Sequence, residues 1–149
     1  MGLYWVSVDA IALSAATAKS VFELATSSTV RVRIVDLSIE FDGVTASAVP
    51  VKVEYGRFSA GVTTATSITP EKYDPADGAS GTTCKHTTTV EGAGTADDIF
   101  FRRIPPTSGM YTQWPLGREP VLAVSTFFRI RLTAAAGVNA TFNISWQEG

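Results

Sequence analysis

Cysteine, histidine and charge are scarce in this sequence. Its 149 residues include one cysteine, Cys84, and one histidine, His86, and only 17% of the residues are charged, where about 25% is usual in a soluble domain. One cysteine cannot form an internal disulfide, so stability must come from packing or from other subunits; the lone thiol is compatible with synthesis in the cytoplasm. The formal net charge of −2 and the scattered basic residues give no electrostatic argument for nucleic acid or an anionic membrane.

Long apolar runs are also missing. No stretch reaches the roughly 20 apolar residues that a membrane-spanning helix needs. Asp9 interrupts the apolar start and no basic segment precedes it, so we expect no cleaved secretion signal. Gly2 does not predict myristoylation, because Val6 stands where Ser or Thr is expected. The chain is long enough for one compact core, and we expect a single domain over residues 1–149.

The residues that commonly carry chemistry form no convincing site. Cys84 and His86 share a face if they lie in a strand, but no further Cys or His completes a zinc site. Side chains two apart on a strand also rarely meet in the orientation that a proton transfer needs. The loop carboxylates at 74–77 and 97–98 follow no EF-hand spacing. We therefore expect no metal, no cofactor and no enzymatic activity, with Cys84 and His86 packed in the core or an interface.

Alternation of apolar and polar residues is abundant. From Val138 to Trp146 every second side chain is apolar and those between are polar, and Val121 to Ala134 follows nearly the same pattern. Each segment therefore has one buried and one solvated face. Joined across residues 135–137, they predict an antiparallel hairpin whose apolar face packs on a second sheet.

The remaining chain predicts several more strands and one long connection. Apolar parity changes at Ile34 and Val35, which indicates a β-bulge there or a strand that crosses between sheets. Asp42-Gly43 is a turn signal before the next strand, and Pro50 favours an edge or the start of that strand. The Thr-, Ser- and Gly-rich range 59–81 predicts a long surface loop that could carry a partner contact. The further expected strands are 3–13, 18–25, 29–41, 49–58, 82–90, 99–103 and 110–114.

Together these features predict the fold class. About eight strands, no amphipathic helix and one long crossing connection are typical of an all-β, single-domain, antiparallel β-sandwich with a jelly-roll-like arrangement.

Two groups of residues are candidates for a partner interface. Leu3, Tyr4 and Trp5 are unusually apolar for a chain terminus; they either pack on the domain's own sheet or belong to an N-terminal arm, residues 1–10, that reaches a neighbouring subunit. The second group combines aromatic anchors with a potential ion pair, a composition found at interface hot spots, although a folded turn packed on its own sheet explains it almost as well. This group consists of Tyr111, Trp114, Arg118 and Glu119.

Arginines recur at period two in two of the expected strands. Arg31 and Arg33 lie in one, and Arg129 and Arg131 lie in the other. This spacing places them on outward faces, either as a solvated surface or as a basic stripe that binds an acidic protein. Both interpretations exclude these arginines from the core.

Short motifs along the chain resemble those of small β-sandwich structural proteins of tailed bacteriophages. They are the Phe41-Asp42-Gly43 turn with a Val-rich strand ending in Val53-Glu54, the Asp74-Pro75 loop, the segment Trp114-Pro115-Leu116-Gly117-Arg118-Glu119-Pro120, and a last alternating strand ending in Trp146. The resemblance implies a virion protein without catalytic residues, made in the host cytoplasm. It implies a capsid decoration (cement) protein or a head or tail accessory protein that binds the major capsid protein or another virion protein, often as a homotrimer.

A different class of function is also compatible with a sandwich. A carbohydrate- or receptor-binding domain of a phage tail or fibre would present sugars to an aromatic platform, for which Trp5, Tyr111 and Trp114 are the candidates. An enzyme would instead need a pocket built on paired carboxylates, and the sequence indicates no such pair.

Overall fold

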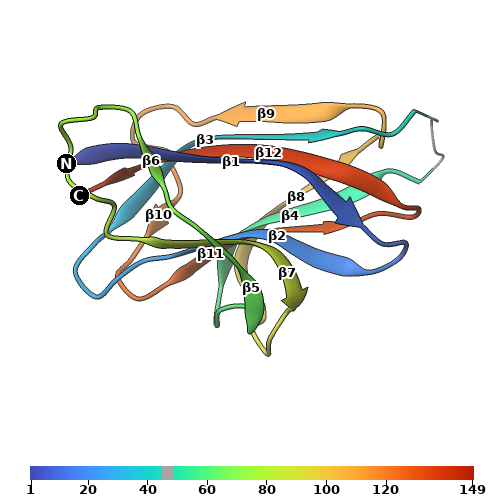
Figure 1. The fold of residues 1–149 in the computed structure, drawn as a ribbon, viewed down its shortest axis with the longest axis horizontal. Coiled ribbons are helices and arrows are strands. Elements are labelled where there is room, and N and C mark those ends of the chain that lie inside the picture. Colours follow the sequence, from blue (N-terminus) through green and yellow to red (C-terminus); the bar gives the residue numbers. More distant parts are fainter. Residues whose placement is uncertain (45–48) are drawn as a thin grey trace.

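The chain folds into two antiparallel β-sheets packed face to face (Figure 1). The computed structural model describes residues 1–44 and 49–149, and for residues 96–99 it describes the backbone alone. Sheet I contains β1 (Gly2–Leu13), β3 (Val32–Phe41), β6 (Glu71–Lys72), β9 (Gly109–Gln113), β10 (Val121–Leu122) and β12 (Val138–Glu148). Sheet II contains β2 (Ala18–Ala25), β4 (Val51–Phe58), β5 (Thr64–Ile68), β7 (Thr83–Val90), β8 (Ala96–Ile104) and β11 (Phe127–Thr133).

The strand order is that of a jelly roll. Eight strands form the jelly roll, in the order β9-β3-β12-β1 in sheet I and β2-β11-β4-β8 in sheet II; β6 and β10 extend sheet I, and β5 and β7 extend sheet II. From β1 to β4, and again from β8 through β9 and β11 to β12, each of the eight strands lies in the opposite sheet from the one before it. This is two interlocked Greek keys and confirms the predicted all-β sandwich. In the described part of the chain, no helix is long and apolar enough to cross a membrane.

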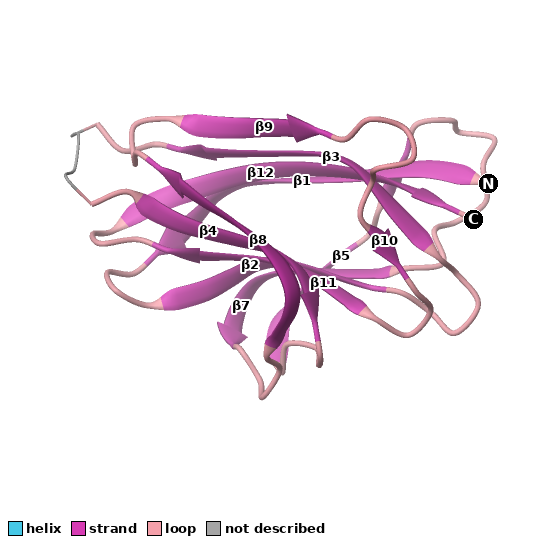
Figure 2. Cartoon of the chain, turned by 180° about the vertical axis from the view of Figure 1, so that it is seen from behind, coloured by secondary structure: helices cyan, strands magenta, loops and turns pink. Residues whose placement is uncertain are grey.

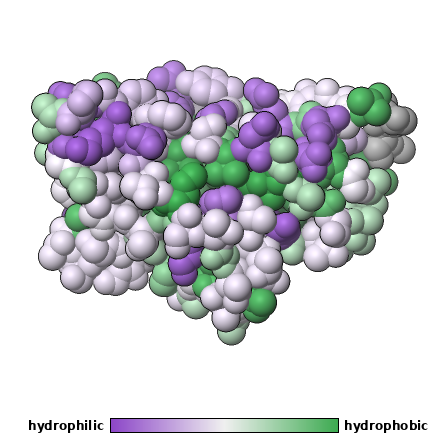
Figure 3. Space-filling model, viewed as in Figure 1, coloured by the Kyte–Doolittle hydropathy of each residue, from purple (hydrophilic) through white to green (hydrophobic). Residues whose placement is uncertain are grey.

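The core lies between the sheets and consists of the inward side chains of the long strands. Phe22 of β2 and Phe142 of β12 meet across it with ring centroids 5.1 Å apart. The core reaches the surface where β1 faces β5 and β7, because Val8 and Ile68 are only partly buried there. Figure 3 shows the corresponding band of apolar residues, in green, across the middle of that face.

The parity change in β3 is a β-bulge, as one of the two sequence interpretations predicted. Ser145 of β12 is opposite Asp36, whereas the next residue, Trp146, is opposite Ile34, so Val35 is the extra residue. Ile34 and Leu37 are both completely buried. The bulge therefore keeps the apolar residues on both sides of it directed at the core, and β3 stays in sheet I.

The predicted C-terminal hairpin is wrong. The predicted apolar faces are correct within β11 and β12, since Ile130 and Phe142 are both completely buried. Val121 to Ala134 is not one strand, because β10 lies in sheet I, β11 lies in sheet II, and Val124 between them is 39% exposed. However, β11 pairs with β2 and β4, whereas β12 pairs with β1 and β3. Residues 135–137 thus cross from one sheet to the other, and the two strands face each other across the core. An alternating pattern defines a buried face but not which partner covers it.

Two other connections differ from the sequence-based expectation. The strand after Asp42-Gly43 begins at Val51, directly after Pro50 as expected, but it lies in sheet II and does not pair with β3. The range 59–81, expected as a loop, contains β5 and β6, which pair with β7 and β1 respectively. The chain therefore uses this segment to widen both sheets.

Candidate interaction surface

The first three interface candidates belong to β1 and are integrated in sheet I. Tyr4 is 4% exposed, stacks on Trp146 and donates a 3.0 Å hydrogen bond from its hydroxyl to the carbonyl of Gly78. Burial is the main cause that raises the pKa of its phenol. Leu3 and Trp5 alternate with it, are half-buried and lie on the outer face of the sheet. Tyr4 therefore offers no surface to a partner in this fold, whereas Leu3 and Trp5 keep part of theirs.

The second group of candidates lies on β9 and on the segment that follows it, at the other edge of sheet I from β1. Tyr111 is in β9 and is 65% exposed; Trp114 follows β9 and is half-buried against the core. The expected ion pair within the turn is not formed. Glu119 instead accepts a 2.6 Å hydrogen bond from the amide of Gly117 and lies 4.0 Å from Arg33, while Arg118 is exposed.

This side of the molecule carries most of the exposed large apolar side chains. Six of the eleven in the described part of the chain fall between residues 100 and 124, on or beside the strands β8, β9 and β10 at the free edges of the two sheets (Figure 2). Their side chains do not all share one face. Tyr111 points outward from sheet I, because Met110 beside it packs on the core, whereas Phe101 points outward from sheet II, because Phe100 beside it stacks on Tyr55. We call this surface the β8–β10 flank. It comprises Phe100, Phe101, Tyr111, Trp114, Leu116, Arg118 and Val121.

A cluster of three rings gives the flank a rigid centre. Phe100 of β8 stacks on Tyr55 of β4 at a centroid distance of 5.3 Å, and Trp114 contacts both rings at 6.2 and 6.5 Å. Tyr55 is buried, whereas Phe100 remains 44% exposed. Burial is the main cause that raises the pKa of the Tyr55 phenol, which also bonds to Thr112. The cluster joins the edges of the two sheets and holds one exposed ring in place.

Beside this cluster is a small hollow of 190 Å³, whose walls combine apolar and cationic groups. Phe100 and Phe128 supply the rings, and Arg118 supplies an exposed guanidinium on the turn that follows β9. A hollow of this size accommodates a side chain better than a drug-sized ligand, for which pockets of about 300–1,000 Å³ are usual.

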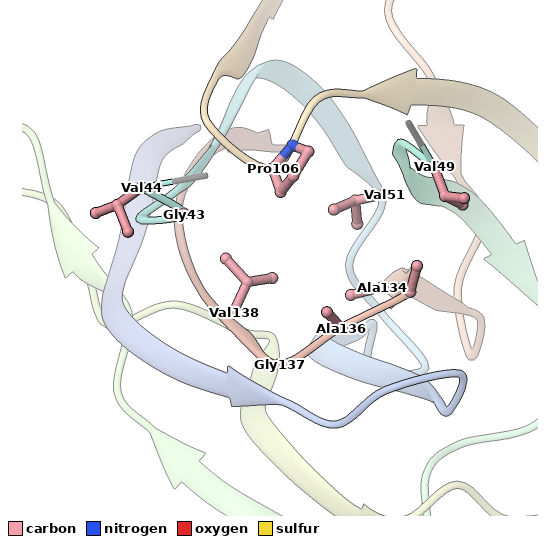
Figure 4. Close-up of a pocket in the computed structure, with 10 residues that line it drawn as sticks. Gly43, Val44, Val49, Val51, Pro106, Ala134, Ala136, Gly137 and Val138 are labelled. Carbon is pink, nitrogen blue, oxygen red and sulfur yellow. The ribbon is translucent and has the colours of Figure 1, made fainter. Parts of the chain in front are cut away.

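A second hollow, shown in Figure 4, lies at the end of the sandwich where three connections meet. Its volume is 200 Å³, and its described lining is entirely Gly, Ala, Val and Pro, including Val51, Pro106 and Val138. These side chains contain no donor, acceptor or titratable group. By its described lining, the hollow suits an apolar group.

Cys84 and His86 do share the inner face of β7, as expected, because their partners Leu24 and Phe22 are core residues. Burial raises the pKa of the Cys84 thiol to about 12, which leaves it protonated. Burial also lowers the pKa of His86, whose Nδ1 bonds to Thr87. Among the side chains that the structure describes, those of residues 1–44, 49–95 and 100–149, no group of three or more His, Cys, Asp or Glu is arranged to hold a metal ion.

The arginine prediction is wrong for Arg129, which is completely buried. It lies on the outer face of sheet II, but residues 60–62 and Glu91 cover it. Its Nε donates to Glu23 at 2.9 Å, and its terminal nitrogens donate to the carbonyls of Ala60 and Glu91. Glu23 also accepts a 2.7 Å hydrogen bond from the amide of Val62. Alternation predicted the correct face of the sheet for Arg129, but residues 60–62, which are distant in the sequence, cover this side chain.

The other three arginines remain on the surface. Arg31 and Arg33 are exposed, and Arg131 is half-buried with two hydrogen bonds of 3.1 and 3.2 Å to Glu54. The two strands lie in different sheets, so their arginines do not form one basic stripe.

Comparison with known proteins identifies no relative: no protein family, no curated protein and no solved structure matches this chain.

Proposed function

We propose that this protein is a non-enzymatic structural component of a virion, a capsid decoration protein that stabilises the shell through protein–protein contacts. The observation that carries the proposal is the β8–β10 flank, where exposed rings and an exposed arginine are mounted on paired strands and a short turn. Aromatic residues and arginine are enriched at interface hot spots. The phage-like motifs noted in the sequence supply the kind of partner, the major capsid protein or another virion protein.

The flank suits a joint between subunits because its geometry is fixed before binding. Tyr111 is held by the pairing of β9 with β3, and Leu116, 97% exposed, is at the tip of the turn that follows. A surface that is already ordered loses little conformational entropy when it binds. Burying Tyr111 and Leu116 against a shell subunit would stabilise the joint by roughly 1.5–3 kcal/mol per side chain.

The test is binding to phage shells. We expect the purified chain to cosediment with capsids of the tailed phage whose genome encodes it, and Tyr111→Ser or Leu116→Ser to weaken that binding by about tenfold or more. Val90→Ser is the matched control, because Val90 is 49% exposed but lies on β7, away from the flank. Equal binding by all variants, or none by the parent chain, would contradict the proposal.

Two further measurements separate the alternatives. Light scattering coupled to size exclusion is expected to show a homo-oligomer, with three chains or a multiple of three as the resemblance implies; a strict monomer counts against the decoration role. A glycan array on which the chain binds, with the signal lost in Trp114→Ala, would favour a carbohydrate- or receptor-binding tail domain instead. Trp114 is half-buried, so the unfolding temperature of that variant must be measured alongside.

A further inference from the structure

Strand β8 is the last strand of sheet II, and its outer edge is open. It pairs with β4 over its whole length, and no described strand lies on its other side (Figure 2). An edge strand presents unpaired backbone groups that can accept a further strand. From Phe100 to Arg103 all four residues are exposed, and Arg102 donates only a long hydrogen bond, 3.5 Å, to the carbonyl of Phe101. This part of the edge is therefore accessible to an extended peptide.

A hollow beside this edge has cationic walls. Its volume is 420 Å³, and it is lined by Lys52, Phe101, Arg102 and Arg103. The ammonium of Lys52 lies over the ring of Phe101, 5.4 Å from its centroid, and Arg103 is opposite Lys52 in the ladder between β4 and β8. Because like charges directly opposite each other are destabilising, an anionic group bound beside them is stabilising.

The carboxylate that the structure describes at this place does not neutralise the cations. Glu54 lies 3.1 Å from Lys52, but it is also 3.1 Å from Arg131, and its side chain is only 5% exposed. Neither Arg102 nor Arg103 forms an ion pair with any side chain that the structure describes. The open edge therefore carries two guanidinium groups without an acidic partner, next to a lysine that shares its own.

We propose that β8 binds an acidic, extended segment of a partner protein, which adds to sheet II as a further strand. Strand addition derives its affinity from backbone hydrogen bonds and its specificity from the side chains, and directly opposite residues share a face of the sheet. An antiparallel segment matches this edge when acidic residues are opposite Arg103 and Arg102 and apolar residues are opposite Phe101 and Phe100. Charges on an edge strand usually prevent pairing; here they exclude basic segments and select acidic ones.

A peptide fits this site better than another polyanion does. The row of backbone donors and acceptors along a strand edge has the repeat of another strand. Single-stranded nucleic acids stack their bases on aromatic rings, but Lys52 already lies over the ring of Phe101. The formal net charge of −2 also gives the whole chain no attraction for a long polyanion. The inference goes beyond the proposed virion role and does not depend on it.

The first test uses synthetic peptides and fluorescence anisotropy. The peptide Thr-Thr-Asp-Asp-Val-Val-Thr-Thr sets its acidic and apolar residues opposite residues 103 to 100 in the antiparallel direction. One control has Lys in place of both Asp residues, and a second has its four central amides N-methylated, which removes their hydrogen-bond donors. We expect saturable binding of the acidic peptide that weakens as salt rises, and no binding of either control.

The second test reverses the charge of the edge. The double variant Arg102→Glu/Arg103→Glu is expected to bind the acidic peptide about tenfold or more weakly and to bind the lysine peptide instead. The matched control is Arg31→Glu/Arg33→Glu, which makes the same change of net charge at exposed positions at the start of β3 and should bind as the parent does. Unfolding temperatures show whether each variant is folded.

The outcomes are distinct. Selective binding of the acidic peptide, its loss on N-methylation and the reversed preference of the β8 variant together support the proposal. No binding of the acidic peptide, equal binding of its N-methylated form, or equal losses in the two double variants would overturn it. Tighter binding of a single-stranded oligonucleotide or a sulfated oligosaccharide would also overturn it, because neither can add as a strand. No shell is used in these tests, so their failure leaves the virion proposal to its own experiment.

Discussion

Arg129 shows how a charged side chain can be buried without entering the core. Its guanidinium lies over the ring of Phe58, with 4.8 Å from Cζ to the ring centroid, and bonds to Glu23 on the neighbouring strand. Glu91 completes the arrangement by accepting 2.5 Å hydrogen bonds from the amide and the hydroxyl of Ser20. The network fastens two segments distant in sequence, 60–62 and Glu91, to the outer face of sheet II. Removing one charge leaves the opposite charge buried alone.

We therefore expect Arg129→Met to lower the free energy of unfolding by about 3–5 kcal/mol, the usual cost of breaking a buried ion pair from one side. The matched control is Arg131→Met, two residues along the same face. Arg131 is 24% exposed in its side chain, and its partner Glu54 keeps Lys52 at 3.1 Å, so that loss should be clearly smaller. Urea denaturation of the three proteins measures the difference. Equal losses would contradict the role assigned to Arg129.

The thiol of Cys84 makes a second prediction at this scale. Burial raises its pKa from 9.0 to about 12, and the reactive species of cysteine is the thiolate. At pH 8 the folded chain should not react with a disulfide reagent such as DTNB, whereas the chain unfolded in urea should react fully. Fast labelling of the folded protein would show that the thiol is accessible.

The same shift gives a pH dependence with a definite sign. Between about pH 9 and pH 12 the unfolded thiol has lost its proton while the folded thiol keeps it, so the unfolded state binds fewer protons. Stability must then fall as pH rises through this range. Cys84→Ala should show a shallower decline than the parent, measured by urea denaturation at pH 8 and pH 10. Identical declines would mean that the thiol titrates alike in both states.

At the scale of the element, the alternation within single strands predicted which face is buried, but it did not predict which strands pair. The bounds expected for β2 and the bulge in β3 are confirmed, because both depend on which side chains avoid water. The hairpin of the last two strands failed because a strand has the same pattern whether its neighbour lies beside it or across the core. For Arg129 no local signal exists, since the segment that covers it lies almost 70 residues away in the chain.

The bulge allows a deletion to be predicted. Removing Val35 should leave a regular strand, because Ile34 and Leu37 then alternate with Asp36 and keep their partners on β12. Its main loss is the 3.2 Å hydrogen bond that the amide of Trp114 donates to the Val35 carbonyl, at about 1 kcal/mol. Deleting Ser38 is the control, since it turns Ile39 to the opposite face. We expect cooperative thermal unfolding for the first deletion and none for the second.

The candidate surface was predicted only in part for the same physical reason. Tyr111 and Arg118 were recognised by residue type and do lie on one flank. Tyr4, chosen for the same apolar character, is buried, because a terminal strand between two others has a core-facing side like any strand. The contribution of Phe100 to this surface was not predicted, since it depends on β8 being the last strand of its sheet. The alternation of apolar and polar residues does not determine the order of strands in a sheet.

At the scale of the whole molecule, the antiparallel pairing of β1 with β12 sets Gly2 opposite Glu148 and so brings the two ends of the chain together. The N- and C-termini lie side by side at one end of the sandwich (Figure 1), and Gln147 donates a 2.8 Å hydrogen bond to the sulfur of Met1. A flexible linker of about six residues can therefore join them. The chain can then be opened at the exposed pair Ala135-Ala136, which gives a circular permutant that begins with β12.

This permutant is expected to fold. β12 is held by its ladders to β1 and β3, and β11 by its ladders to β2 and β4, so the cut removes a connection and no strand pairing. Its unfolding free energy should fall by no more than about 2 kcal/mol, because loop-closure terms change slowly with length. A permutant opened between Arg129 and Ile130 is the control and should not fold, because it divides a buried central strand. If the 135–136 permutant also fails to unfold cooperatively, this prediction is wrong, and folding requires the intact connection at residues 135–137.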